Sequence, residues 1–88
     1  MNVDNVYADM TTLLLCSRIH QNLPLKTRTI KIKRTAKLIL KHTESPVLVK
    51  LCKNIILAVS SGKYQKTLDV INRVEHDYII LRGATKDA

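Results

Sequence analysis

Apolar residues recur along most of the chain at intervals of three and four, the spacing of one face of an α-helix. The clearest case follows Ser45 and Pro46, a pair typical of a helix start, and ends at the Ser-Ser-Gly turn at 60–62. Its apolar positions are Leu48, Leu51, Cys52, Ile55, Ile56 and Val59. We expect this helix to be the central and most buried one.

Two further helices are predicted at the ends of the chain. The first covers about residues 4–22, with Asp4 as its cap and Pro24 as the break that follows it. The last covers about residues 63–81, and Gly83 is placed to be its C-cap. Its apolar stripe consists of Tyr64, Leu68, Ile71, Val74, Tyr78 and Leu81.

The segment 27–42 has two interpretations. Residues 27–34 alternate with a period of two, which fits a short strand. From Thr29 onward the apolar residues also share one side of a helix, while lysines recur four residues apart on another side. We favour a helix from about Thr29, because no other segment offers a partner strand and a lone strand leaves its backbone groups unsatisfied.

These segments predict a compact all-α bundle of about four helices with a C-terminal helical hairpin. The chain has 88 residues, of which 45% are hydrophobic, so we expect one folded domain over residues 1–82 and a short flexible tail over 83–88. Its core must be aliphatic, because the chain has no Phe, no Trp and three Tyr. A homodimer would bury apolar surface that so small a domain struggles to hide, so a second copy is one expected partner.

The turn between the last two helices, residues 58–68, resembles the turn of a tetratricopeptide-type helical hairpin. The resemblance covers a single turn. Arrays of this type need about three repeats, and the chain contains no second copy of the pattern. We therefore predict an ordinary antiparallel hairpin.

The net charge of +8 arises in one part of the chain. Residues 10–43 contain eight basic side chains and no acidic one, whereas the remaining residues carry seven of each. Such a segment suits a polyanion, an acidic protein or an anionic lipid surface. The basic residues are Arg18, Lys26, Arg28, Lys31, Lys33, Arg34, Lys37 and Lys41.

From this segment we predict a small regulatory protein that binds nucleic acid, DNA or RNA. On a helix, basic residues over positions 33–41 would follow one edge for about two turns, roughly 12 Å, which suits phosphates along a backbone. Lys outnumbers Arg five to two over residues 26–41, which favours phosphate contacts over base reading. No aromatic residue lies nearby to stack an unpaired base, so a duplex is favoured. The predicted binding residues are Lys26, Arg28, Lys31, Lys33, Arg34, Lys37 and Lys41.

Residues 19–33 also resemble the turn and the start of the recognition helix in bacterial helix-turn-helix regulators. Thr27 and Arg28 would open the recognition helix, which implies site-specific DNA binding. The apolar positions of the motif are occupied by Leu23, Leu25 and Ile30. Three positions depart from the pattern: His20 replaces a small residue, Pro24 replaces the turn glycine, and Lys33 stands where the helix usually packs inward.

An alternative function is a non-enzymatic module that docks an acidic protein partner. A membrane role is disfavoured, because the interface residues Trp and Phe are absent and the longest apolar run has five residues, against about 20 for a span. The start of the chain lacks the pattern of a secretory signal, and there are only two cysteines. We therefore expect an intracellular protein, in the cytoplasm or nucleus, with reduced thiols.

Patterns for catalysis and metal binding are weak. Cys16 and His20 would share a helix face, and His42 and Cys52 would complete a four-ligand set, but Cys52 lies in an apolar run that fits a buried thiol better. Only two glycines occur, which leaves no phosphate-cradling loop and no nucleophile elbow. The acidic residues beside His76 are Glu75 and Asp77, and residues adjacent in sequence do not face each other on a helix. We predict no enzyme activity, no metal and no cofactor.

Overall fold

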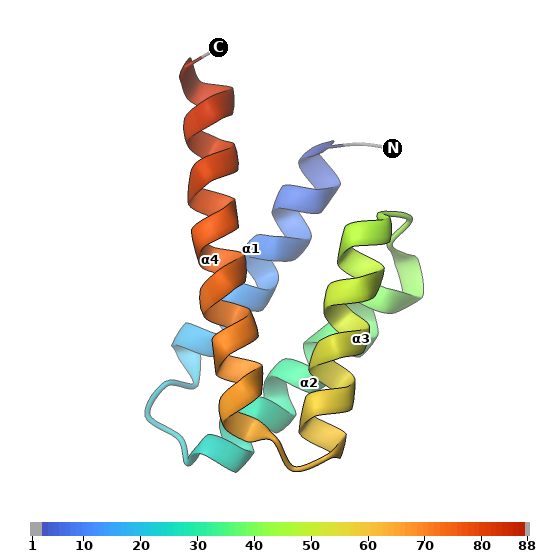
Figure 1. Ribbon diagram of the computed structural model, residues 1–88, viewed down its shortest axis with the longest axis vertical. Helices are drawn as coiled ribbons and strands as arrows, with labels where there is room; N and C mark the ends of the chain where they lie inside the picture. The colour runs from blue at the N-terminus through green and yellow to red at the C-terminus, as the bar shows by residue number, and fades with distance from the viewer. Residues whose placement is uncertain (1–2, 88) are drawn as a thin grey trace.

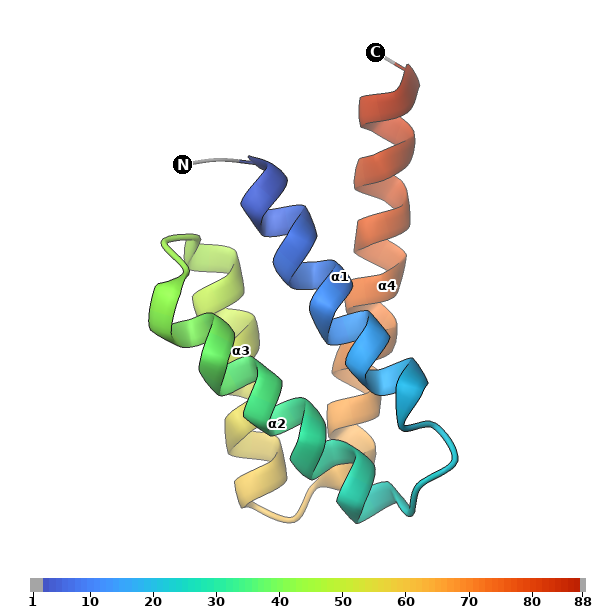
Figure 2. The ribbon, with the colours of Figure 1, turned by 180° about the vertical axis from the view of Figure 1, so that it is seen from behind.

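The computed structural model describes the backbone of residues 3–87 and the side chains of residues 6–80. It contains four helices: α1 (Val3–Ile19), α2 (Leu25–His42), α3 (Pro46–Ser60) and α4 (Tyr64–Asp87). Over residues 3–87 there is no strand, so the prediction of an all-α bundle with a C-terminal hairpin is confirmed. Helices α3 and α4 lie in front of α1 and α2 in Figure 1, and behind them in Figure 2.

The segment with two interpretations is helical throughout. Helix α2 begins at Leu25, four residues earlier than predicted, and the carbonyl of Pro24 accepts a hydrogen bond from the amide of Arg28 at 2.9 Å. Its buried residues recur every three or four positions. In a strand, residues three apart would point to opposite faces, so this core pattern fits only the helix. The buried residues are Thr29, Ile32, Ala36 and Ile39.

Helix α3 has the boundaries that its sequence signals predict. The Ser45 hydroxyl accepts a hydrogen bond from the Leu48 amide at 3.4 Å, and Pro46 occupies the first turn. At the other end, Gly62 adopts a φ of 74°, and the amides of Gly62 and Lys63 bond back to the carbonyls of Val59 and Ala58. This is a Schellman motif, which a glycine in the left-handed region closes without strain.

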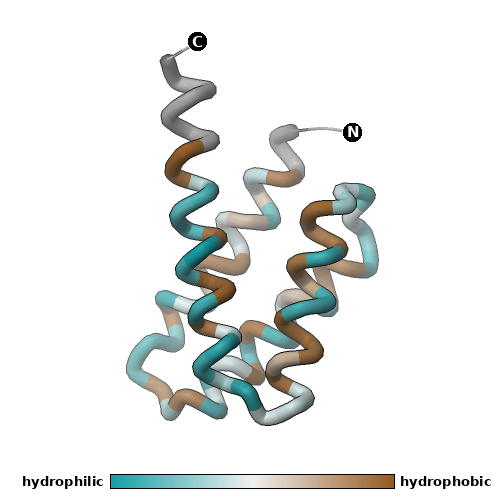
Figure 3. The backbone as a smooth tube through the Cα atoms, viewed as in Figure 1, coloured by the Kyte–Doolittle hydropathy of each residue, from teal (hydrophilic) through white to brown (hydrophobic). Residues whose placement is uncertain are grey.

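The core is aliphatic and receives side chains from all four helices. Helix α3 is mostly hydrophobic along its length, as Figure 3 shows, and its Cys52 and Ile55 are fully buried. The main cluster of buried residues consists of Leu13, Ile32, Ala36, Ile39, Cys52, Ile55 and Ile71. A smaller cluster of Met10, Leu48 and Val74 continues it.

The two terminal helices differ from their predicted limits. Helix α4 continues to Asp87 and, at its C-terminal end, extends past the start of α1 (Figure 1), so the predicted C-cap at Gly83 is wrong. A glycine inside a helix costs only about 1 kcal/mol, which one long helix can absorb. Helix α1 begins at Val3, which places Asp4 inside it rather than at its cap, and it ends at Ile19. The boundary between a domain over residues 1–82 and a tail over 83–88 stays a prediction.

None of the four helices, as far as the structure describes them, is long and apolar enough to cross a membrane.

Candidate nucleic-acid interface

Five cationic side chains of α2 lie on the side away from its buried residues. With 3.6 residues per turn, they fall within an arc of about 100° and extend over about 22 Å of the helix. Four are exposed, and Lys33, at the edge of the arc, is half-buried. We call these residues the basic face: Lys26, Lys33, Arg34, Lys37 and Lys41.

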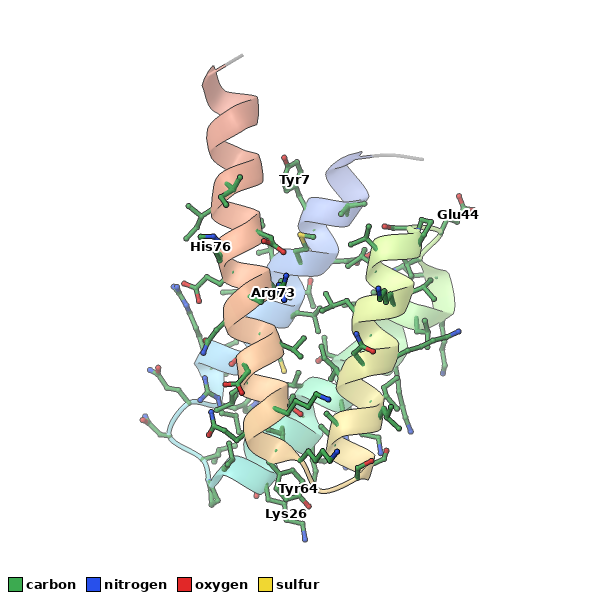
Figure 4. The ribbon with its side chains drawn as sticks, viewed as in Figure 1. Tyr7, Lys26, Glu44, Tyr64, Arg73 and His76 are labelled. Carbon is green, nitrogen blue, oxygen red and sulfur yellow. The ribbon has the colours of Figure 1, made fainter. Side chains whose placement is uncertain are left out.

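No carboxylate neutralises the basic face. Helix α2 contains neither Asp nor Glu. Among side chains 6–80, the ion pairs are Arg18 with Glu75 and His42 with Asp9, and neither uses a lysine or arginine of α2. Figure 4 places Lys26 at one end of the bundle and Glu44 at the opposite end, in the loop after α2. The basic face is therefore open to an external anion along its length.

The basic face also carries a small internal repulsion. Lys33, Lys37 and Lys41 follow each other at intervals of four, which stacks three like charges on one side of the helix. Such like-charge pairs cost about 0.2–0.5 kcal/mol each. A polyanion bound to this face would remove the cost of this repulsion.

Arg28, one of the seven predicted binding residues, has a different environment. Its Nε donates to the Ser17 carbonyl at 3.0 Å, and its Nη2 donates to the Ser17 hydroxyl at 2.8 Å. The side chain is half-buried between the start of α2 and the last turn of α1. We leave Arg28 out of the basic face, because two of its donors serve the fold. Lys31, also half-buried, lies outside the arc as well.

Two cations that the sequence analysis did not select extend the positive region onto α3. Lys50 and Lys53 are exposed, and α3 contains no acidic residue. Residues 25–60, which we call the α2–α3 hairpin, carry nine basic side chains against the single acid Glu44. The rest of the chain holds six of each, so the whole net charge of +8 belongs to this hairpin. In the sequence, Glu44 ends the acid-free run and separates Lys50 and Lys53 from the cations of α2.

The four candidate metal ligands do not come together. Cys16 Sγ lies 3.8 Å from His20 Nδ1, as their spacing predicts, but His42 pairs instead with Asp9 at 3.2 Å. Nowhere in the described part of the chain do three or more His, Cys, Asp or Glu side chains form a group that could hold a metal ion. Burial raises the pKa of the Cys52 thiol to about 11, and the negative charge of Asp9 adds to the shift. Cys52 is thus a protonated core thiol near neutral pH.

The helix-turn-helix resemblance finds little support in the geometry. Leu23 and Leu25 occupy positions where that motif buries apolar residues, yet both are exposed. Arg28, which would open the recognition helix, bonds to Ser17 of the preceding helix. Leu23, Leu25 and Arg28 are therefore not arranged as the motif requires.

This chain matches no known protein-family model, no curated protein and no solved structure.

Proposed function

We propose that this protein binds duplex nucleic acid through the basic face of α2, mainly by contacts with phosphates. One observation carries the proposal: five cations lie along about 22 Å of one helix side that has no carboxylate and no internal ion pair among the described residues. Each strand of duplex DNA carries one phosphate per about 3.4 Å of helix axis, so several phosphates lie within reach of a face this long. Lys50 and Lys53 add charge on the neighbouring helix.

The composition of the basic face supports backbone contact over base reading. Four of its five residues are lysines, which act as flexible point charges. Arg34 is its single arginine, the residue type that grips a guanine edge with two hydrogen bonds. We therefore propose weak sequence preference and a regulatory role that depends on occupancy of the duplex.

The positions of the tyrosines support a duplex rather than a single strand. None of the three is exposed: Tyr7 and Tyr78 meet edge to face with ring centroids 5.9 Å apart, and Tyr64 is half-buried at the start of α4. Figure 4 shows Tyr7 directed from α1 toward α4. Proteins that bind single strands use exposed aromatic rings to stack bases.

We propose a binding role rather than catalysis, inside the cell. Both cysteines are free thiols, which supports a reducing compartment.

A second candidate function is docking of an acidic protein. The α2–α3 hairpin exposes Leu38, Val47 and Leu57 together with its cations. Exposed aliphatic side chains beside charge suit a protein surface better than a phosphate backbone. The experiment below separates the two candidates.

The test compares two triple variants that each remove three exposed positive charges. One is Arg34→Ala, Lys37→Ala and Lys41→Ala on the basic face, and the other is Lys63→Ala, Lys66→Ala and Arg73→Ala outside the hairpin. Fluorescence anisotropy with 20-base-pair DNA and RNA duplexes measures affinity, and circular dichroism checks folding. We expect the first variant to lose at least about 30-fold and the control less than about threefold, because phosphate contacts contribute locally.

Two outcomes contradict the proposal. Equal losses in both variants would show that total charge, and not the basic face, determines binding. No affinity of the unmodified protein for any duplex at about 50 mM salt, where phosphate contacts are strong, would favour the acidic-protein function.

A further inference from the structure

The half of the bundle formed by α1 and α4 has a surface of different character. Outside the α2–α3 hairpin the basic and acidic residues balance at six each. Here a groove of about 250 Å³ runs between the two helices. Leu15 of α1 is 51% exposed beside it, and Ile79 of α4 is 61% exposed. We call this region the α1–α4 face, lined by Leu14, Leu15, Arg18, Glu75, Tyr78 and Ile79.

Contacts inside the bundle hold the groove in shape. Arg18 Nη2 and Glu75 Oε1 form an ion pair at 2.9 Å that joins the two helices. The Thr11 hydroxyl donates to the Tyr78 hydroxyl at 3.2 Å, and Tyr7 packs edge-on against the same ring. The groove is therefore formed before any partner arrives, which lowers the entropy lost on binding.

Ile19 extends the apolar surface beside this groove. It stands four residues after Leu15, so the two side chains share one side of α1, and it is exposed at the end of the helix. Leu15, Ile19 and Ile79 thus expose three large aliphatic side chains on the electrically balanced half of the molecule.

Electrostatics indicate what can cover this surface. Two copies of the chain, each with a net charge of +8, repel each other wherever their α2–α3 hairpins meet. They can approach through the α1–α4 face, where charges of both signs are present. A two-fold axis at the groove would place Arg18 of each copy near Glu75 of the other, which makes the face complementary to itself.

From these observations we propose that a second copy of this chain docks on the α1–α4 face, through contacts centred on Leu15, Ile19 and Ile79. A standard interface takes about 800 Å² from each partner, a modest part of the 5912 Å² that this chain exposes. The dimer leaves both basic faces on its outer sides. The inference rests on the α1–α4 face and on the position of the charge excess, and it does not depend on the proposed nucleic-acid binding.

Sedimentation equilibrium of the full chain tests the dimer, with four single variants at exposed aliphatic positions. Leu15→Asp and Ile79→Asp place a charge in the interface, whereas Leu38→Asp and Leu57→Asp place the same charge on the α2–α3 hairpin. We expect the first two to weaken the dimer at least about 30-fold, as substitutions at the centre of an interface do. The matched hairpin variants should keep it. Circular dichroism confirms folding, which exposed positions should not disturb.

Salt separates this proposal from the nucleic-acid proposal. High salt screens the repulsion between two +8 chains and should tighten the dimer, whereas it should weaken binding to a duplex. A monomer at every concentration up to about 1 mM would contradict the dimer proposal and leave the duplex-binding proposal unaffected. A dimer that Leu15→Asp and Ile79→Asp leave intact would overturn the assigned face.

Discussion

The guanidinium of Arg28 joins the first turn of α2 to the last turn of α1, because it donates to both the carbonyl and the hydroxyl oxygen of Ser17. The Ser17 carbonyl belongs to the last turn of α1, where carbonyls lack partners within the helix. A positive charge at the C-terminal end of a helix is also favourable. Arg28 thus stabilises the α1–α2 connection, although the sequence counts it with the cations of α2.

Replacing Arg28 should therefore affect stability more than binding. We expect Arg28→Ala to lower the free energy of unfolding by about 1.5–3 kcal/mol, the range for hydrogen bonds that involve a charged group. Arg34→Ala is the matched control, because Arg34 is exposed on the same helix and should change stability by no more than about 0.5 kcal/mol. Urea unfolding followed by circular dichroism measures both. Equal destabilisation by the two changes would contradict the role given to Arg28.

Duplex binding should fall steeply with salt. Each neutralised phosphate releases counterion with a slope of about −0.9 in log K against log salt, so five outward cations predict a slope of about −4 to −5. Anisotropy titrations between about 50 and 300 mM salt, where counterion release dominates the salt dependence, measure the slope. Unrelated duplex sequences should bind alike. A site preferred by about 10³-fold, as specific DNA binders show, would instead revive the helix-turn-helix interpretation.

Ile55 should be among the most sensitive core positions. Its side chain is fully buried in the main cluster, so Ile55→Ala leaves a cavity and should cost about 2–5 kcal/mol in the free energy of unfolding. Leu57→Ala, two residues later on the same helix, is the control, because that side chain is 66% exposed. It should change stability by about 0.5 kcal/mol or less. Chemical denaturation gives both values. Similar losses in the free energy of unfolding at the two positions would contradict the buried position of Ile55.

The two cysteines should react differently with a thiol reagent. Cys52 is fully buried and its pKa is raised to about 11, whereas Cys16 is partly exposed. Near pH 7.5 we expect one thiol per folded chain to react quickly and the second only after unfolding. Cys16→Ala should remove the fast phase. A fast phase that persists in that variant would show that Cys52 is accessible.

The raised pKa of Cys52 also predicts a loss of stability in alkali. The unfolded chain releases the thiol proton near the ordinary pKa of 9.0, but the folded chain retains it until about 11. The contribution of the neutral thiol to the free energy of unfolding is therefore fully present below pH 9 and declines as the pH rises toward 11. Cys52→Ala should lack this part of the pH dependence in thermal unfolding followed by circular dichroism. An identical alkaline decline in that variant would assign the effect to other groups.

The features that the sequence predicts well depend on residues close together in the chain. Ser45 and Pro46 start α3, and the turn at Gly62 ends the same helix through contacts within five residues, so local patterns locate both ends. In α2, the helical spacing of Ile32, Ala36 and Ile39 is visible in the sequence, and the structure buries all three. Local signals fail at Gly83, where α4 continues through a residue type that often ends helices.

The features that the sequence does not predict depend on residues brought together by the fold. The acid-free run locates α2 as the candidate site, but it cannot show that Arg28 meets Ser17 eleven positions earlier. Lys50 and Lys53 escape notice because Glu44 interrupts the run, although α2 and α3 pack side by side. The groove between α1 and α4 joins residues more than fifty positions apart. No local pattern in a single sequence reveals such contacts.

Concentration of the whole charge excess in the α2–α3 hairpin makes this molecule an electric dipole. Its extents are 40 × 25 × 17 Å, whereas at physiological salt an electrostatic field decays over about 8 Å. A polyanion at close range therefore acts strongly on the near side of the molecule and weakly on the far side. The resulting torque turns the hairpin toward the polyanion before the surfaces touch, so that more encounters begin in a productive orientation.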